Sequence, residues 1–223
     1  MERHFQKELE SLKTSLVKMG SVVEENFNKS IRSIIEKDII LAQQVIETDT
    51  RVDSLEIEID NAIIDLLALQ QPVASDLRFI LAALKINNDL ERIGDHAVNI
   101  AQSVQILCSI PEIKMIDEIP KMASLTKAML KDALDSFILL NTAIAQKVLQ
   151  SDDQVDDLNR LVTKKVIEIV KANTESVECE MELSRISRNL ERIADLTTNI
   201  AEDVIFHAQA RIVKHHAEEK NRG

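Results

Sequence analysis

Apolar side chains recur every three to four residues along almost the whole of the 223-residue chain. In the first segment this spacing includes Phe27, Ile31 and Ile34, and it places side chains on one face of an α-helix. Because short polar or proline-containing stretches interrupt the pattern at only a few places, we predict a small number of long helices. They cover residues 5–36, 38–69, 74–108, 121–140, 142–172 and 176–215.

Composition supports this interpretation, since the chain contains only 3 glycines and 3 prolines. β-Sheet folds join their strands through tight turns that use both residues heavily. P-loop and Rossmann proteins need glycine-rich loops, and neither G-x-G-x-x-G nor G-x-x-x-x-G-K occurs in the sequence. We therefore predict an all-α fold without a nucleotide-binding loop of these kinds.

Two segments of the chain recur about 100 residues later. Residues 90–104 and 190–204 are identical at nine of 15 positions, and residues 41–55 and 144–158 at seven of 15. Such self-similarity indicates an internal duplication, in which each copy supplies three helices with short connections. The predicted architecture is a tandem repeat of two three-helix bundles.

The boundary between the copies is expected where two prolines, Pro111 and Pro120, lie close together. Proline ends or interrupts helices, which makes this stretch a natural joint. The predicted organisation is a first bundle over 1–108, a joint over 109–120, a second bundle over 121–215 and a charged tail over 216–223.

The net charge of −11 excludes some classes of partner. Nucleic-acid binding favours a basic surface, so we expect no nucleic-acid partner. A membrane-spanning helix needs about 20 apolar residues, whereas the longest apolar run covers only residues 79–84. Cys108 and Cys179 are expected to be small apolar helix residues in a reducing compartment. Contact with a membrane is therefore expected only through partners.

The repeated segments share carboxylates spaced four residues apart, which lie on one face of a helix. Asp53 and Glu91 are equidistant from Pro72, where we expect a turn. Asp156 and Glu191 are equally placed about the turn expected after residue 172. Antiparallel helices should therefore bring four carboxylates together in each copy. The candidate metal ligands are Asp49, Asp53, Glu91, Asp95, Asp152, Asp156, Glu191 and Asp195.

On a helical wheel these acids point away from the apolar face. Like charges held close together raise one another's pKa and destabilise a fold unless a cation compensates them. Oxygen ligands suit hard ions such as Mg²⁺, Ca²⁺, Mn²⁺ or iron. The alternative is that Arg92 and Arg192, three residues before Asp95 and Asp195, form surface ion pairs, each worth about 0–1 kcal/mol. The sequence leaves both interpretations open.

The histidines are weaker candidates for metal ligands than the carboxylates. His96 is replaced by Leu196 in the second copy, so we expect a half-buried structural histidine. His207, His215 and His216 are expected at an exposed polar end. Di-iron bundles use Glu-x-x-His pairs, and this sequence contains neither such a pair nor a nucleophile elbow, H-E-x-x-H or C-x-x-C. We therefore expect a protein that is not an enzyme.

The doubled motif LERIGDHAVNIA and LERIADLTTNIA, together with the D-x-x-x-D pairs and the element at residues 76–78, resembles the PhoU family of bacterial phosphate-regulation proteins. The resemblance covers residues 5–210. It implies two three-helix bundles whose E(D)-x-x-x-D motifs bind metal, with iron favoured and Mg, Mn, Ca or Zn as alternatives. One departure is that residues 176–178 read Ser-Val-Glu where the first copy has Asp-Leu-Arg.

The resemblance also implies a function. It predicts a cytoplasmic homodimer that acts between the ATPase subunit of a phosphate ABC transporter and a phosphate-sensing histidine kinase. Such a protein would regulate phosphate uptake and act as a negative regulator of the phosphate-starvation response. The rival hypotheses from the residues are a metal-dependent helical-bundle enzyme and a metal-free structural spacer.

Overall fold

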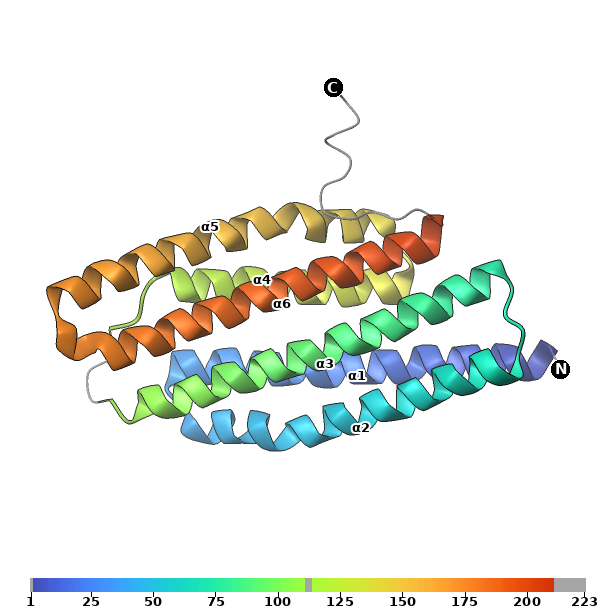
Figure 1. Ribbon diagram of the computed structural model, residues 1–223, viewed down its shortest axis with the longest axis horizontal. Helices are drawn as coiled ribbons and strands as arrows, with labels where there is room; N and C mark the ends of the chain where they lie inside the picture. Colours follow the sequence, from blue (N-terminus) through green and yellow to red (C-terminus); the bar gives the residue numbers. More distant parts are fainter. Residues whose placement is uncertain (1, 111–113, 211–223) are drawn as a thin grey trace, which may run out of the picture.

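The computed structural model describes residues 2–110 and 114–210, which form long α-helices without a strand in those ranges (Figure 1). The all-α prediction is confirmed. The helices are α1 (Glu2–Glu36), α2 (Ile39–Leu69), α3 (Ala74–Cys108), α4 (Glu118–Leu139), α5 (Thr142–Ala172) and α6 (Val177–Gln209), with a short 3₁₀ turn, η1 (Thr174–Ser176), before α6.

The helix boundaries agree with the sequence prediction except near the joint and the ends. α3 and α5 begin and end where expected, whereas α4 begins three residues earlier than expected. Pro120 therefore lies in the first turn of α4, where a helix does not need the missing N–H. α1 begins at Glu2 instead of residue 5. Pro111, the predicted end of the sixth helix over 211–215 and the tail 216–223 lie outside the described residues.

The duplication is visible in the turns that follow the first helix of each copy. Lys37 and Leu140 occupy equivalent positions and adopt left-handed backbone angles, with φ of 52° and 49°. The next residues, Asp38 and Asn141, each accept hydrogen bonds from two backbone N–H groups of the following helix. Such caps satisfy backbone donors that would otherwise lack a partner. The same local chemistry therefore starts α2 and α5.

The helices run along the long axis of an elongated molecule (Figure 1). α3 and α6 lie antiparallel along its centre and pack against each other, while α2 and α5 flank them on opposite sides. Their motif residues Leu90, Ile93, Leu190 and Ile193 are fully buried, and the buried apolar residues of both copies form one continuous core. The boundaries at 108 and 121 stay predictions, because this core extends across them.

Polar contacts also join α3 to α6. Lys85 Nζ lies 2.6 Å from Asp203 Oδ1, and His96 Nδ1 lies 2.8 Å from Asn189 Oδ1. His96 is half-buried, which confirms the structural role expected of it. Because polar groups at a buried interface are costly unless paired, these contacts favour one register of α3 on α6.

No helix among the described residues combines the length and apolar character that crossing a bilayer requires.

Truncation of equivalent core residues tests whether the two copies fold as one unit. Ile93 and Ile193 are both 0% exposed, so Ile93→Ala and Ile193→Ala should each lower the free energy of unfolding by about 2–5 kcal/mol. Because the core is shared, urea unfolding followed by circular dichroism at 222 nm should show one transition that both variants shift. Two separate transitions, each sensitive to only one variant, would contradict a shared core.

Candidate functional site

Carboxylates from α2 and α3 gather in the first copy. α2 ends at Leu69 and α3 begins at Ala74, so the two helices run antiparallel from a turn at Pro72, as predicted. We define the first acidic cluster as the carboxylates that act on one another across these helices: Asp49, Asp53, Glu56, Glu91 and Asp95. The structure therefore brings together the four acids predicted for this copy and adds Glu56.

The acids of the first acidic cluster are not all solvated. Asp53 and Asp95 are exposed, as predicted from the helical wheel. Asp49, Glu56 and Glu91 are half-buried, because they lie where α2 packs against α3. The prediction that the acids face away from the core is thus only partly correct, and three of these charges lose part of their hydration.

Burial and mutual repulsion raise the pKa values of this cluster. Burial, followed by the charges of Asp53 and Asp95, raises the pKa of Asp49 to about 6. Burial and the neighbouring carboxylates, Asp95 foremost, raise the pKa of Glu91 to about 7. The pKa of Glu56 is also raised, again mainly by burial. Near neutral pH the cluster therefore carries charge that the fold disfavours.

Gly94 on α3 lies beside Asp49 of the first acidic cluster, and a side chain at this position would make ordinary van der Waals contacts. A Cβ at position 94 would lie 3.4 Å from Asp49 Oδ1 and 3.4 Å from a methyl of Val52. The second copy has Ala194 at the equivalent position. The first copy therefore leaves space beside the Asp49 carboxylate that a methyl group would fill.

The ion-pair alternative fails for the first acidic cluster. Arg92 Nη1 lies 3.7 Å from Asp89 Oδ1 instead of pairing with Asp95. Within the part of the chain that the structure describes, no salt bridge reaches any carboxylate of this cluster. The repulsion between these carboxylates is therefore left without a side-chain counter-ion.

The second acidic cluster, formed by Asp152, Asp156, Glu191 and Asp195, differs in this respect. All four side chains are half-buried. Arg192 lies 3.4 Å from Asp195 and 3.6 Å from Glu191, and Arg160 lies 3.9 Å from Asp156. Burial still raises the pKa of Glu191 and of Asp195, but the Arg192 charge opposes both shifts. Arginine compensation, which we offered as the alternative for both copies, is confirmed here.

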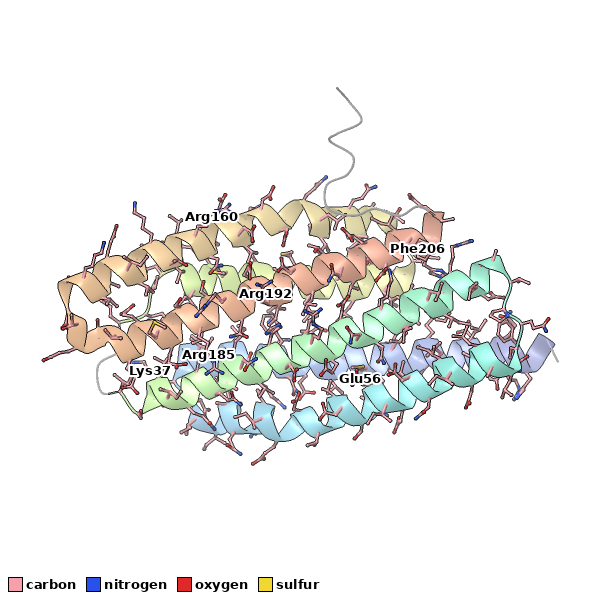
Figure 2. The ribbon with its side chains drawn as sticks, viewed as in Figure 1. Lys37, Glu56, Arg160, Arg185, Arg192 and Phe206 are labelled. Carbon is pink, nitrogen blue, oxygen red and sulfur yellow. The ribbon has the colours of Figure 1, made fainter. Side chains whose placement is uncertain are left out.

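Figure 2 shows Arg160 on the outer helix α5, Arg192 on α6 near the middle of the molecule, and Glu56 of α2 in the other half of it. Glu56 was missed because we required each acid to recur in both copies. Its counterpart is Asn159, whose Oδ1 accepts a hydrogen bond of 2.7 Å from the Ser187 hydroxyl. The available signal was the spacing of three residues from Asp53, which places Glu56 on the same helical stripe.

The first acidic cluster fits a hard cation in charge and in donor atoms, since every candidate ligand is a carboxylate oxygen. The described side chains do not, however, gather three or more His, Cys, Asp or Glu groups into a ligating arrangement. Binding would therefore require rotation of side chains, which the exposed positions of Asp53 and Asp95 allow. Metal binding by either cluster stays a prediction.

Comparison with known proteins gives a consistent result. The family model described as "PhoU domain" matches residues 16–104 and again residues 119–204. A phosphate-specific transport system accessory protein PhoU homolog of Aquifex aeolicus is 38% identical over 96% of this chain and 97% of its own length. A homolog with the same description from Clostridium acetobutylicum is 36% identical over 91% of this chain and 93% of its own length.

Solved structures agree with the sequence matches. The crystal structure of PhoU from Pseudomonas aeruginosa has a TM-score of 0.91 and 34% identity, and the match covers 93% of this chain and 100% of that one. The crystal structure of the phosphate transport system regulatory protein PhoU from Streptococcus pneumoniae has a TM-score of 0.88 and 30% identity. This match covers 95% of this chain and 100% of that one.

Removal of one charge from the first acidic cluster should stabilise the metal-free protein. The pKa of Glu91 lies above its ordinary value of 4.5, at about 7, so between these values the folded state binds more protons than the unfolded state. Stability therefore falls as pH rises through this window. Glu91→Gln should reduce that fall and raise Tm at pH 8 in the presence of a chelator by about 2–4 °C, the effect of roughly 1 kcal/mol.

The matched control is Glu191→Gln in the second acidic cluster. Because the Arg192 charge opposes the rise in the pKa of Glu191, this change should raise Tm less than Glu91→Gln does. A Glu91→Gln variant that melts at or below the wild-type temperature at pH 8 would contradict the assigned repulsion.

Proposed function

The chain belongs to the PhoU family, and from that premise we propose that it regulates phosphate uptake and represses the phosphate-starvation response as a metal-binding adaptor. The family places it among accessory proteins of phosphate transport. In our proposal it acts in the cytoplasm, as a homodimer, between a phosphate ABC transporter ATPase and a phosphate-sensing histidine kinase. The observation that carries the adaptor role is the pair of acidic clusters, one between α2 and α3 and one between α5 and α6, on one continuous core.

In this proposal the first acidic cluster is the principal cation site. Asp49, Asp53, Glu91 and Asp95 would hold the ion, with Glu56 beside them. The bound ion supplies positive charge that neutralises their repulsion. Iron is favoured by the resemblance, and Mg, Mn, Ca or Zn are the other candidates. Once the carboxylates no longer repel one another, they would hold α2 against α3. This would fix the relative position of the two helices and hence the shape of the outer face that they form.

A non-catalytic role is favoured by the relatives, which are named accessory or regulatory proteins. Partner docking is favoured by apolar side chains on the outer face of the first copy near its Pro72 turn. These residues are Ile57, Ile64, Leu67, Leu77, Leu81 and Leu84, all exposed. Exposed apolar side chains gathered on neighbouring helices are typical of protein-interaction surfaces. We therefore propose this face of α2 and α3 as the docking surface.

Cation binding should appear as added stability. At a free Mn²⁺ concentration about 100-fold above its Kd, the ion should stabilise the wild type by about 2.7 kcal/mol, measured as a rise in Tm at pH 7.5 over protein in chelator. Asp53→Asn and Asp95→Asn should each reduce this rise, while Asp156→Asn in the second acidic cluster should retain most of it. Equal Tm values with and without Mg²⁺, Ca²⁺, Mn²⁺, Zn²⁺ and iron would favour the metal-free spacer.

Docking is tested with one substitution made in each copy. Ile64 and Ile167 are repeat counterparts, 61% and 48% exposed. Ile64→Glu should abolish co-purification with the transporter ATPase or the histidine kinase, because a charge on this surface cannot be desolvated cheaply, whereas Ile167→Glu should retain it. Absence of wild-type binding to both partners would contradict the adaptor role. A catalytic activity of the wild type that Asp95→Asn abolishes while the fold stays intact would instead support the hypothesis of a metal-dependent enzyme.

A further inference from the structure

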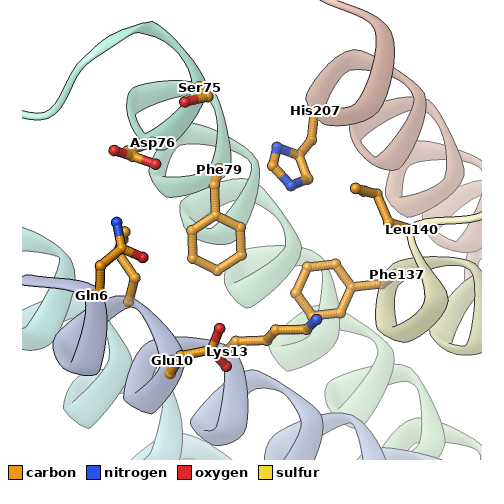
Figure 3. Close-up of a pocket in the computed structure, with 10 residues that line it drawn as sticks. Gln6, Glu10, Lys13, Ser75, Asp76, Phe79, Phe137, Leu140 and His207 are labelled. Carbon is orange, nitrogen blue, oxygen red and sulfur yellow. The ribbon is translucent and has the colours of Figure 1, made fainter.

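A cavity of about 210 Å³ lies at the end of the molecule where α1 and α3 begin and α4 and α6 end (Figure 3). α1 and α3 belong to the first copy and α4 and α6 to the second, so the cavity lies between the two copies. Its lining includes Phe79, which is half-buried, and Leu140, which is 43% exposed. Both copies therefore leave apolar surface uncovered at this end.

Charged groups surround this apolar surface. Glu10, Lys13 and Asp76 also line the cavity, and Figure 3 shows them around the ring of Phe79. Two carboxylates thus lie beside one ammonium group, and among the described residues neither carboxylate takes part in a salt bridge. A segment that carries apolar side chains together with positive charges would complement this lining.

His207 places the end of α6 at the cavity. Its ring lies 5.4 Å from that of Phe79, and its side chain is half-buried. The expectation that His207 lies at an exposed polar end is therefore wrong, and His215 and His216 lie outside the described residues. Because His207 is three residues before Ala210, where α6 is capped, the chain leaves this helix about one turn from the cavity.

The opposite end of the molecule shows how the equivalent space is filled in the other half of the duplication. Lys37 there is the repeat counterpart of Leu140, and Leu107 is that of His207. Both line a space of only about 10 Å³ together with Met115. Met115 comes from the segment that follows α3, and it packs against the core. The chain that leaves α3 therefore covers the gap between the copies at that end.

The segment that follows α6 has a suitable composition for the same role. It begins Arg211-Ile212-Val213-Lys214, with two apolar residues between two basic ones. An extended chain advances about 3.3–3.6 Å per residue, so both apolar residues come within about 7–11 Å of Ala210. A cavity of about 150 Å³ suffices for benzene, so the larger cavity here accommodates a branched aliphatic side chain.

We propose that the segment formed by residues 211–214 occupies this cavity. Its apolar side chains pack on Phe79 and Leu140, and its basic side chains lie beside Glu10 and Asp76. Because the segment is attached to α6, its effective concentration at the cavity is on the order of millimolar, so a weak contact suffices to keep it there. The contact ties the end of the second copy to the first. The inference goes beyond the adaptor role and does not rest on it.

Fluorine NMR of the full chain with fluorinated phenylalanine tests this contact. An uncharged gadolinium chelate in solution broadens the signals of exposed rings, so the broadening of the Phe79 signal reports whether the cavity is covered. In a variant that combines Ile212→Asp with Val213→Asp, the Phe79 signal should broaden several-fold more than in the wild type. The signal of Phe27, which is fully buried in the core, should be the same in both proteins.

The matched control combines Ala217→Asp with Asn221→Asp, which adds the same two charges to the same segment outside the proposed contact. It should leave the Phe79 signal as in the wild type. Tm should fall by about 2–4 °C in the variant at positions 212 and 213 and stay unchanged in the control.

Three results would overturn the proposal. The first is equal broadening of the Phe79 signal in the wild type and in the variant at positions 212 and 213. The second is an equal effect of the control, which would indicate a response to charge alone. The third is protection of Phe79 that disappears on dilution of the wild type, because the segment would then come from a second copy of the chain.

Discussion

The antiparallel packing of α3 against α6 is the interaction on which the rest of the structure depends. Each helix carries the same motif, with apolar residues such as Ile93 and Ile193 on one side and carboxylates on the other. Because the apolar sides of α3 and α6 are buried in a common core, their carboxylates in the two acidic clusters lie toward α2 and α5. The same packing brings the start of α3 to the end of α6, where Phe79 and His207 meet. The positions of both acidic clusters are thus consequences of one interface.

The two copies have used this common framework differently. In the second, Arg192 neutralises part of the charge on Glu191 and Asp195 at short range. In the first, Arg92 turns to Asp89, and a fifth carboxylate, Glu56, adds to the repulsion that raises the pKa of Glu91. The charge of one cluster is therefore partly compensated by arginine, and the other is stable near neutral pH only at a cost that a bound cation would offset.

Prediction from sequence succeeded where a local rule determines the result. Apolar spacing and the duplicated motif correctly predicted the helices and their pairing. Equal distance from Pro72 correctly predicted that Asp53 and Glu91 lie at the same height along antiparallel helices and interact. Prediction from sequence failed where a side chain has more than one possible partner within reach. Arg92 has acids within one turn on either side, and only packing selects Asp89. The contact between Phe79 and His207 was also missed, because these residues are far apart in sequence and meet only when α6 packs on α3.

The central claim is that the unpaired carboxylates of the first acidic cluster hold a cation. The most direct measurement is anomalous X-ray scattering from crystals grown with Mn²⁺ or iron and recorded at the metal absorption edge. The account predicts a peak between α2 and α3, within ligand distance of Asp49, Asp53, Glu91 or Asp95. A peak confined to the arginine-compensated second cluster, or no peak in metal-saturated crystals, would contradict it.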